Sequence, residues 1–212
     1  MTDMKNILFD LDGTLTDPAL GITNSVMHAL KRFNIPLPPR DELYKFIGPP
    51  LAESFEKYYG FSDGQVAVEV YREYFSTKGL YENELYNGIE ELLKLLYENG
   101  YRIYLATSKP EIYAKQILEH FNIDKYFTDA VGSLLNGNSV EKGEVIAHLL
   151  KKHNITDAIM IGDRCFDIAG AKENGIKSIG VLYGYGTEDE LKDADFIVSS
   201  VTELKNLLKS GL

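Results

Sequence analysis

The chain has 212 residues, 44% of them hydrophobic, and carries a formal net charge of −10. Its length and composition fit a globular protein of one large domain, or of one domain with a substantial insertion. The charge argues against a nucleic-acid polymer or an anionic membrane surface as partner, because an acidic protein attracts neither. It does not argue against a small anionic ligand, since a local site can oppose the overall field.

The sequence also indicates a compartment. Cys165 is the single cysteine, which excludes an internal disulfide framework and fits a reducing environment. Neither a secretory signal pattern nor an apolar run of membrane-spanning length is visible. We therefore expect a cytoplasmic protein that is not embedded in a membrane.

The first predicted strand, NILFD (6–10), is short and apolar, and no convincing strand follows it between residues 18 and 78. Apolar residues at helical spacing instead predict helical segments at 19–33, 41–47, 51–59 and 65–77. Asp17 and Pro18 precede the first of these segments, so we expect the Asp17 side chain to cap that helix.

An all-helical insertion after the first strand predicts a second, smaller domain. We place this domain at residues 17–79, where the strand pattern is interrupted, and assign residues 1–16 and 80–212 to the main domain. No internal repeat or low-complexity segment suggests another division of the chain.

After the insertion, apolar runs alternate with helical patterns. The runs are RIYLATS (102–108), DAVGSL (129–134), AIMIGD (158–163), SIGVLYG (178–184) and DFIVSS (195–200). The helical patterns cover 88–100, 110–121, 141–153 and 166–175. Runs that are apolar throughout suit strands buried on both faces. The alternation therefore predicts an α/β fold, with a Rossmann-like parallel-sheet core domain and the inserted helical domain.

Polar side chains stand at the ends of several predicted strands. They are Asp10, Asp12, Thr107, Ser108, Asp163 and Asp167, and Lys142 opens the helix before the fourth strand. Because ligand sites of open parallel sheets lie at the carboxyl ends of the strands, we expect these groups to lie together. Carboxylate oxygens suit Mg²⁺, while hydroxyl and ammonium groups hold phosphoryl oxygens. The set predicts Mg²⁺-assisted phosphoryl transfer.

Three motifs in this set resemble those of the haloacid dehalogenase superfamily, in its phosphatase branch. DLDGT (10–14) is similar to the first motif of that superfamily, Thr107 in LATSKP to the second, and GDRCFD (162–167) to the fourth. FIGPPL (46–51), inside the insertion, is similar to phosphoglycolate-phosphatase-like and 5′-nucleotidase-like members. The resemblance covers nearly the whole chain and implies that the insertion is a helical cap.

The resemblance also implies roles for the carboxylates. Asp10 would be the nucleophile that forms an aspartyl-phosphate, and Asp12 the general acid and then the general base. Mg²⁺ would be bound by the Asp10 carboxylate, the Asp12 backbone carbonyl and Asp163. Asp167 would lie close by, either as a direct ligand or as support at a helix N-terminus.

The phosphate ligands implied by the resemblance are Thr107, the Ser108 amide and Lys142. Lys109 is a rival for the lysine role, because Lys142 lies closer to its helix than the family pattern has it. Gly48, Pro49 and Pro50 form either a plain turn or a substrate-facing loop of the cap, since a cap needs an element that reaches over the site. The glycine pair in GYG (184–186) lacks the full dinucleotide-binding spacing, so we interpret it as structural.

These features predict a Mg²⁺-dependent phosphatase that acts on a small phosphorylated metabolite: phosphoglycolate, a nucleoside monophosphate or a sugar phosphate. Three alternatives share parts of the pattern. A haloacid dehalogenase would typically lack Asp12, whereas a β-phosphoglucomutase-like phosphotransferase has the same core motifs. A receiver-type signalling module also uses a strand-end aspartate and Mg²⁺, but Asp12, GDxxxD and the long insertion favour an enzyme that turns over.

Overall fold

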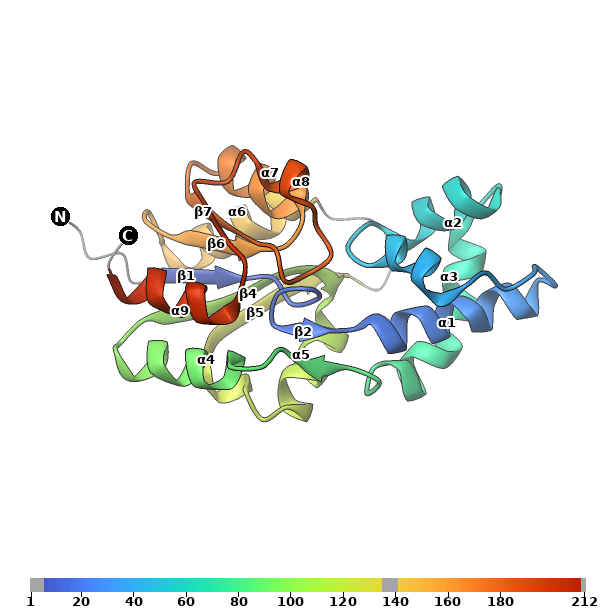
Figure 1. The fold of residues 1–212 in the computed structure, drawn as a ribbon, viewed down its shortest axis with the longest axis horizontal. Coiled ribbons are helices and arrows are strands. Elements are labelled where there is room, and N and C mark those ends of the chain that lie inside the picture. Colours follow the sequence, from blue (N-terminus) through green and yellow to red (C-terminus); the bar gives the residue numbers. More distant parts are fainter. Residues whose placement is uncertain (1–5, 135–140, 211–212) are drawn as a thin grey trace. The chain divides into compact units, whose positions relative to one another are not determined.

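The computed structural model describes residues 6–134 and 141–210, and Figure 1 shows its ribbon. The chain separates into two compact units. One unit joins the segment up to Thr16 with the segment from Leu85 onward, and the other is Asp17–Glu84. We refer to them as the sheet unit and the helical unit. Among the described residues, no helix has the length and apolar character needed to cross a membrane.

The sheet unit is built on six strands within the described residues, in the order β5-β4-β1-β6-β7-β8. All neighbouring pairs run parallel. The strands are β1 (Asn6–Phe9), β4 (Arg102–Pro110), β5 (Phe127–Ser133), β6 (Ile159–Gly162), β7 (Lys177–Val181) and β8 (Phe196–Val198). The predicted α/β fold with a Rossmann-like parallel sheet is confirmed.

β1 occupies the centre of this sheet, and all four of its residues are buried. Leu8 pairs in register with Tyr104 of β4 on one side and Met160 of β6 on the other. A strand enclosed on both faces and both edges must be apolar throughout, which explains the uninterrupted run in the sequence. The pairing with β6 also fixes the position of Asp10, the polar residue after β1. The backbone N–H of Asp10 donates to the Ile161 carbonyl at 2.9 Å.

Helices cover both faces of the sheet. They are α4 (Ile89–Glu98), α5 (Glu111–His120), α6 (Lys142–His153), α7 (Cys165–Glu173), α8 (Glu188–Leu191) and α9 (Val201–Ser210), with a 3₁₀ turn, η3, at Asp124–Tyr126. Figure 1 shows α4 and α5 on one face and α6 and α7 on the other. This split follows from the strand order, because right-handed crossovers on the two sides of β1 place their helices on opposite faces.

One core cluster joins α6 to the sheet. Val145, Ile146 and Leu149 of α6 are buried against Leu8 and Met160, with other apolar residues of the same cluster around them. Burying one such side chain stabilises the fold by about 1.5–3 kcal/mol. This contact holds α6 firmly on the sheet, and its first residue, Lys142, is placed at the carboxyl edge.

The helical unit contains α1 (Ala19–Arg32), the 3₁₀ helix η1 (Arg40–Phe46), α2 (Leu51–Tyr59), α3 (Gly64–Tyr74) and the π-helical turn η2 (Phe75–Gly79). The predicted helical segments are found, but 41–47 is 3₁₀ rather than α, and 65–77 widens into a π turn. α1 approaches η2 closely, since a Cβ atom at Gly21 would overlap the Gly79 carbonyl. Aromatic rings fill the interior, and Phe46 and Phe55 meet edge to face at 5.0 Å.

The start of α1 differs by one residue from the expected cap. The helix begins at Ala19, so Pro18 occupies the cap position. The Asp17 side chain nevertheless accepts the Ala19 backbone N–H at 3.0 Å. Asp17 therefore satisfies a first-turn donor, as a capping residue does.

Two short strands lie where the chain passes between the units. β2 (Thr16–Asp17) and β3 (Glu84–Leu85) pair as a separate two-stranded sheet. They account for the two connections of the insertion, which leave and return side by side.

Candidate active site

The DLDGT segment turns sharply as soon as β1 ends. The Gly13 N–H donates to the Thr16 carbonyl at 2.8 Å, and Gly13 has φ +84°. That backbone conformation favours glycine. A Cβ atom at Gly13 would also overlap the carboxylate of Asp163. The glycine is therefore required both by the turn and by the close approach of the next motif.

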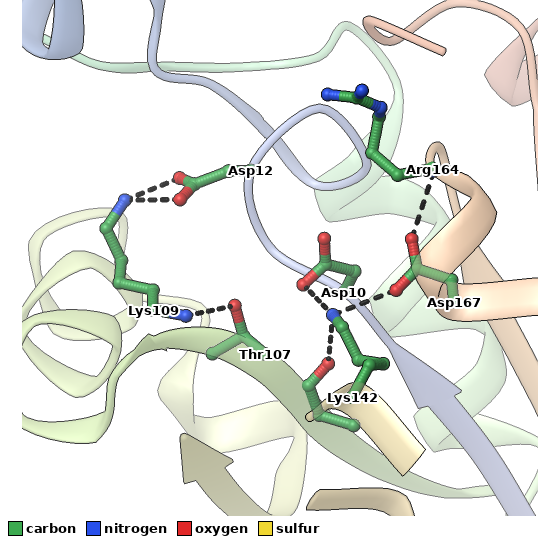
Figure 2. A network of polar contacts seen from close by, with 8 residues as sticks. Asp10, Asp12, Thr107, Lys109, Lys142, Arg164 and Asp167 are labelled. Carbon is green, nitrogen blue, oxygen red and sulfur yellow. Dashed lines mark hydrogen bonds and ion pairs between the residues drawn. The ribbon is translucent and has the colours of Figure 1, made fainter. Parts of the chain in front are cut away.

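Asp10 is nearly buried, and its carboxylate meets Lys142. The Lys142 Nζ donates to Asp10 Oδ1 at 2.7 Å and to the Ala106 carbonyl at 3.0 Å. It also forms an ion pair with Asp167 Oδ1 at 2.8 Å. Figure 2 shows both carboxylates directed at this one ammonium group. The ammonium group thus makes two hydrogen bonds and one further ion pair.

Lys142 keeps its charge in this position although its side chain is 5% exposed. Burial disfavours the ammonium form, but the carboxylates of Asp10 and Asp167 outweigh burial and raise the Lys142 pKa above its usual value. The site therefore contains a cation beside the Asp10 carboxylate.

Asp12 meets the other lysine. Lys109 Nζ lies 2.6 Å from each oxygen of the Asp12 carboxylate, and Figure 2 shows this pair turned away from the Lys142 cluster. Burial raises the pKa of Asp12, and the Lys109 charge opposes that shift. From the sequence, Lys109 and Lys142 are alternatives for one role. In the structure the two lysines contact different carboxylates, because Lys109 pairs with Asp12 and Lys142 does not.

Thr107, Ser108 and Lys109 lie near the end of β4, where its pairing with β5 shifts register between Ala106 and Pro110. Irregular pairing of this kind redirects side chains and is frequent beside active sites. Thr107 is buried and its hydroxyl accepts the Lys109 backbone N–H at 3.3 Å, while Ser108 is half-buried. The structure thus brings the second motif to the same edge as the first.

Asp10, Asp163 and Asp167 form an acidic triad whose ligand oxygens all lie within 4.8 Å of one another. Asp163 is fully buried, and its Oδ2 accepts the Tyr185 backbone N–H at 2.8 Å. Its Oδ1 is buried without a hydrogen-bond partner among the described residues. Burial, together with Asp167 and Asp10, raises the pKa of Asp163 well above its usual value. An uncompensated buried oxygen beside two carboxylates is the environment that a cation relieves.

The charges of the site fit a divalent cation. Asp10, Asp12, Asp163 and Asp167 supply four carboxylates against the two ammonium groups of the lysines already described. If all four carboxylates are ionised, two negative charges exceed the two ammonium groups, and all the candidate ligand atoms are oxygens, which suit a hard dication. The residues present therefore fit the metal that the sequence predicts at this position.

The sequence left two roles open for Asp167, as a metal ligand or as support at a helix N-terminus, and both oxygens of its carboxylate have contacts. Its Oδ2 accepts the Arg164 backbone N–H at 3.1 Å, which caps the first turn of α7. Its Oδ1 pairs with Lys142, and its carboxylate belongs to the acidic triad. Burial raises the pKa of Asp167 above its usual value.

The loop around GYG (184–186) was missed as part of the site. A Cβ atom at Gly184 would overlap the Gly13 carbonyl, and one at Gly186 would overlap the Asp163 carbonyl. Next to them, the Tyr183 hydroxyl donates to the Thr14 carbonyl at 3.1 Å. The glycines have a structural role, as the sequence indicated, and the residue that they pack against is Asp163. The sequence did contain a signal for this contact. The glycines come just after β7, which is the neighbour of β6, the strand that precedes Asp163.

Two other sequence features are not members of the acidic triad. Gly48, Pro49 and Pro50 form the turn between η1 and α2 in the helical unit, with Gly48 at φ +102°. Cys165 begins α7 and is half-buried, and burial raises the pKa of its thiol. In the part of the chain that the structure describes, the acidic triad is the one metal-competent group, and it includes neither cysteine nor histidine.

Comparison with known proteins assigns this geometry to a family. Residues 7–181 match haloacid dehalogenase-like hydrolases. The chain belongs to this family. The match spans both acidic motifs and the helical unit, so the predicted membership of the haloacid dehalogenase superfamily is confirmed.

Individual relatives of this haloacid dehalogenase-like hydrolase carry several names. A 5′-nucleotidase of Pseudomonas aeruginosa is 49% identical over 191 residues, which cover 88% of the chain and 86% of that protein. The tyrosine-protein kinase PtkA of Mycobacterium bovis is 36% identical over 208 residues, covering 95% of the chain and 72% of that protein. Further relatives, 29% identical, are named phosphoglycolate phosphatase.

A solved structure gives the same assignment. The crystal structure of a predicted phosphatase from Clostridium acetobutylicum superimposes with a TM-score of 0.93 at 47% identity, covering 98% of this chain and 99% of that one. The predicted enzyme class, a hydrolase of the family's phosphatase branch, is confirmed by these relatives.

Proposed function

We propose that this haloacid dehalogenase-like hydrolase is a Mg²⁺-dependent phosphatase that cleaves a small phosphomonoester through an aspartyl-phosphate on Asp10. The observation that carries the proposal is the Asp10 carboxylate itself. It is nearly buried, belongs to an acidic triad with an unpaired oxygen, and lies 2.7 Å from the Lys142 ammonium group. A carboxylate held in this way can attack a phosphorus atom while the adjacent cation stabilises the phosphoryl oxygens.

The reaction has two steps. In the first, an Asp10 carboxylate oxygen forms a bond to phosphorus, the bond from phosphorus to the ester oxygen breaks, and the departing oxygen takes a proton from Asp12. In the second, a water oxygen attacks the same phosphorus and gives a proton back to Asp12. Inorganic phosphate leaves and the Asp10 carboxylate is restored. The same residue is acid and then base because the second step reverses the proton transfer of the first.

Asp12 is suited to exchange a proton because burial and the neighbouring lysine shift its pKa in opposite directions. Burial favours its protonated form, and the Lys109 ammonium group at 2.6 Å favours its ionised form. Lys142, the Thr107 hydroxyl and the Ser108 backbone amide would hold the phosphoryl oxygens. In this proposal Lys142 is the phosphate-binding lysine and Lys109 supports the acid–base residue.

The metal would be held by the Asp10 and Asp163 carboxylates and the Asp12 backbone carbonyl, with Asp167 beside them. When bound, Mg²⁺ supplies positive charge that favours ionised Asp10 and offsets the charge of the phosphoryl group. The support for this ion is the close group of buried carboxylate oxygens and the Asp163 Oδ1 atom that has no hydrogen-bond partner among the described residues.

The substrate class rests on the relatives rather than on the motifs. We place a nucleoside monophosphate first, since the relative that is 49% identical is named 5′-nucleotidase, and phosphoglycolate second. A sugar phosphate is third. The helical unit would act as the cap that excludes water and selects the substrate, with Gly48, Pro49 and Pro50 as its candidate specificity loop. A cytoplasmic location fits substrates of this kind.

A second candidate is a phosphotransferase, which would return the phosphoryl group from Asp10 to an acceptor other than water. It is favoured by the relative that is 36% identical and is named a tyrosine-protein kinase. It would use the same Asp10, Asp12 and acidic triad. The phosphatase and the phosphotransferase would therefore differ only in the molecule that accepts the phosphoryl group from Asp10.

The test is hydrolysis of p-nitrophenyl phosphate with Mg²⁺ and then with chelator. We expect phosphate release that needs Mg²⁺ and is lost in Asp10→Asn. A panel of nucleoside monophosphates, phosphoglycolate and sugar phosphates then ranks the natural substrates, and glucose 1-phosphate with a bisphosphate primer exposes mutase activity. Release that persists in chelator or in Asp10→Asn would refute the proposal, and transfer faster than hydrolysis would favour the second candidate.

A further inference from the structure

Two helices of the sheet unit cross at a pair of glycines beside the active site. A Cβ atom at Gly170 of α7 would lie 2.9 Å from the Gly143 nitrogen and 3.2 Å from the Gly143 Cα of α6. Both glycines are buried. The two backbones therefore approach more closely than any other residue type would permit at this crossing.

The crossing lies close in sequence to two side chains of the active site, Lys142 and Asp167. Gly143 follows Lys142, and Gly170 lies about one helical turn after Asp167. The ion pair between these side chains, Lys142 Nζ to Asp167 Oδ1 at 2.8 Å, closes on the side that faces Asp10. The separation of the two helices at the crossing therefore affects the distance between the Lys142 ammonium group and the Asp167 carboxylate.

Asn174 joins the helices at this crossing. It is the residue that ends α7, and its side-chain amide donates to the Gly170 carbonyl at 2.8 Å and to the Gly143 carbonyl at 2.9 Å. The first bond closes the end of its own helix. The second reaches the other helix, at the residue next to Lys142, and has no role in ending α7.

We propose that Asn174 is a positioning residue of the active site, which fixes α6 against α7 and so holds the Lys142 ammonium group between Asp10 and Asp167. This inference rests on the proposed function, because it gives Lys142 a role in the reaction. The hydrogen bonds described for Asn174 reach neither the acidic triad nor the lysines, and the residue would act through the Gly143 backbone. A shift of the α6 terminus would move the cation away from the phosphoryl oxygens.

Asn99 provides a matched control. It ends α4 as Asn174 ends α7, and its amide donates to the carbonyl four residues earlier, Leu95, at 2.7 Å. That bond is the counterpart of the one from Asn174 to Gly170. Asn99 makes no bond to another helix in the hydrogen bonds described for it, so it reproduces the helix-ending part of the role without the positioning part.

The experiment compares Asn174→Asp with Asn99→Asp, each alone and combined with Lys142→Met. An aspartate keeps the shape of asparagine but loses the N–H donors and faces two carbonyl oxygens. We expect Asn174→Asp to lower kcat for p-nitrophenyl phosphate about 10-fold, because small misplacements of a catalytic group cost large factors in rate. Asn99→Asp should stay within about twofold of the wild type.

The double variants decide whether the effect passes through Lys142. In the Lys142→Met background we expect Asn174→Asp to cause no further loss of kcat, since the group that it positions is gone. If Asn174→Asp does not fold, Asn174→Ala removes the same bonds without placing a carboxylate against the carbonyls. Circular dichroism and the melting temperature of each variant report the folded fraction, so kcat is expressed per folded enzyme.

Three results would overturn the inference. Asn174→Asp and Asn174→Ala could match Asn99→Asp in kcat, which shows that Asn174 only ends its helix. The loss could be as large in the Lys142→Met background as without it, which shows that it does not act through Lys142. If Lys142→Met alone keeps full activity, the proposed role of Lys142 fails as well, and this outcome separates a failure of the proposed function from a failure of Asn174 alone.

Discussion

The two ends of α6 bring lysines to carboxylates in opposite ways. At its start, the buried Lys142 meets Asp10 and Asp167, and a third carboxylate, Asp163, stays uncompensated. At its other end, Lys152 and His153 both lie 2.7 Å from Asp129 Oδ2 in β5. The first cluster has more carboxylates than cations, and the second has more basic groups than carboxylates.

The pKa directions show what this difference means. Burial raises the pKa of Asp163 and of Asp167. Burial acts in the same direction on Asp129, but the hydrogen bonds from His153, Lys152 and the Ala130 backbone prevail and lower its pKa to about 2. At the start of α6, burial therefore disfavours the ionised carboxylates, a cost that a bound cation would offset, whereas at the end of α6 the ionised Asp129 stabilises the fold. Substitutions at the two ends should separate activity from stability.

The largest effect is expected for Asp10→Asn. Removing the attacking carboxylate should lower phosphatase turnover by at least about a thousandfold, as the loss of a nucleophile does in other enzymes that form covalent intermediates. Asp129→Asn should keep turnover within about twofold. Steady-state hydrolysis of p-nitrophenyl phosphate at saturating Mg²⁺ measures both, and equal losses in the two variants would remove the distinction between the ends of α6.

The second largest effect is expected at the two lysines of the site, which should differ in how much activity their substitution costs. Lys142→Met removes the cation beside Asp10, so we expect a loss of about 100-fold in kcat. Lys109→Met leaves that cation in place and should cost less, with its main effect on the pH profile through Asp12. Turnover across pH checks both. Loss of activity in Lys109→Met while Lys142→Met stays near wild type would reverse the assignment of the lysines.

The effect of Mg²⁺ on the melting temperature should also differ between variants at the two ends of α6. A ligand that binds the folded state at ten times its Kd stabilises it by about 1.4 kcal/mol, so Mg²⁺ should raise the melting temperature and chelator should lower it. Asp163→Asn should abolish this shift, because it removes a buried ligand of the triad. Asp129→Asn should retain it. Calorimetric scans with and without Mg²⁺ measure the shift, and a Mg²⁺ response that survives Asp163→Asn would place the ion elsewhere.

The smallest effect is a pH-dependent loss of stability in Asp129→Asn. The pKa of Asp129 is about 2 in the folded protein and 3.8 in its usual state, so the ionised group stabilises the fold above pH 3.8 and loses that contribution as pH falls to about 2. We expect Asp129→Asn to cost about 1–2 kcal/mol at pH 7 and almost nothing near pH 2. Urea unfolding at both pH values checks this, and a cost that does not depend on pH would contradict it.

The sequence was informative where one strong constraint decides the outcome. Strands enclosed on both faces are apolar throughout, so β1 and β6 could be predicted, and the aspartates after them had to meet at the carboxyl edge. Asp10 and Asp163 were therefore identified as neighbours before the fold was known. In the same way, the helical pattern predicted over 88–100 stops at Gly100, which has φ +78° after α4.

The remaining features depend on where side chains reach in three dimensions. Spacing along the chain could not show that Lys109 turns to Asp12 while Lys142 reaches Asp10, because both lysines lie at the same edge of the sheet. The contact of Gly184 with Asp163 joins segments that no local pattern connects. The 3₁₀ and π turns of the helical unit were missed for a related reason, since tertiary packing rather than periodicity decides between helix types.

The central claim is that Asp10 becomes phosphorylated during turnover. The most direct measurement is acid quenching of the enzyme with substrate and Mg²⁺, followed by borohydride, which reduces an acyl phosphate to an alcohol. We predict that peptide mass spectrometry finds homoserine at position 10, and that this product is absent without substrate. Full turnover with an unmodified Asp10, or modification at another carboxylate only, would contradict the account.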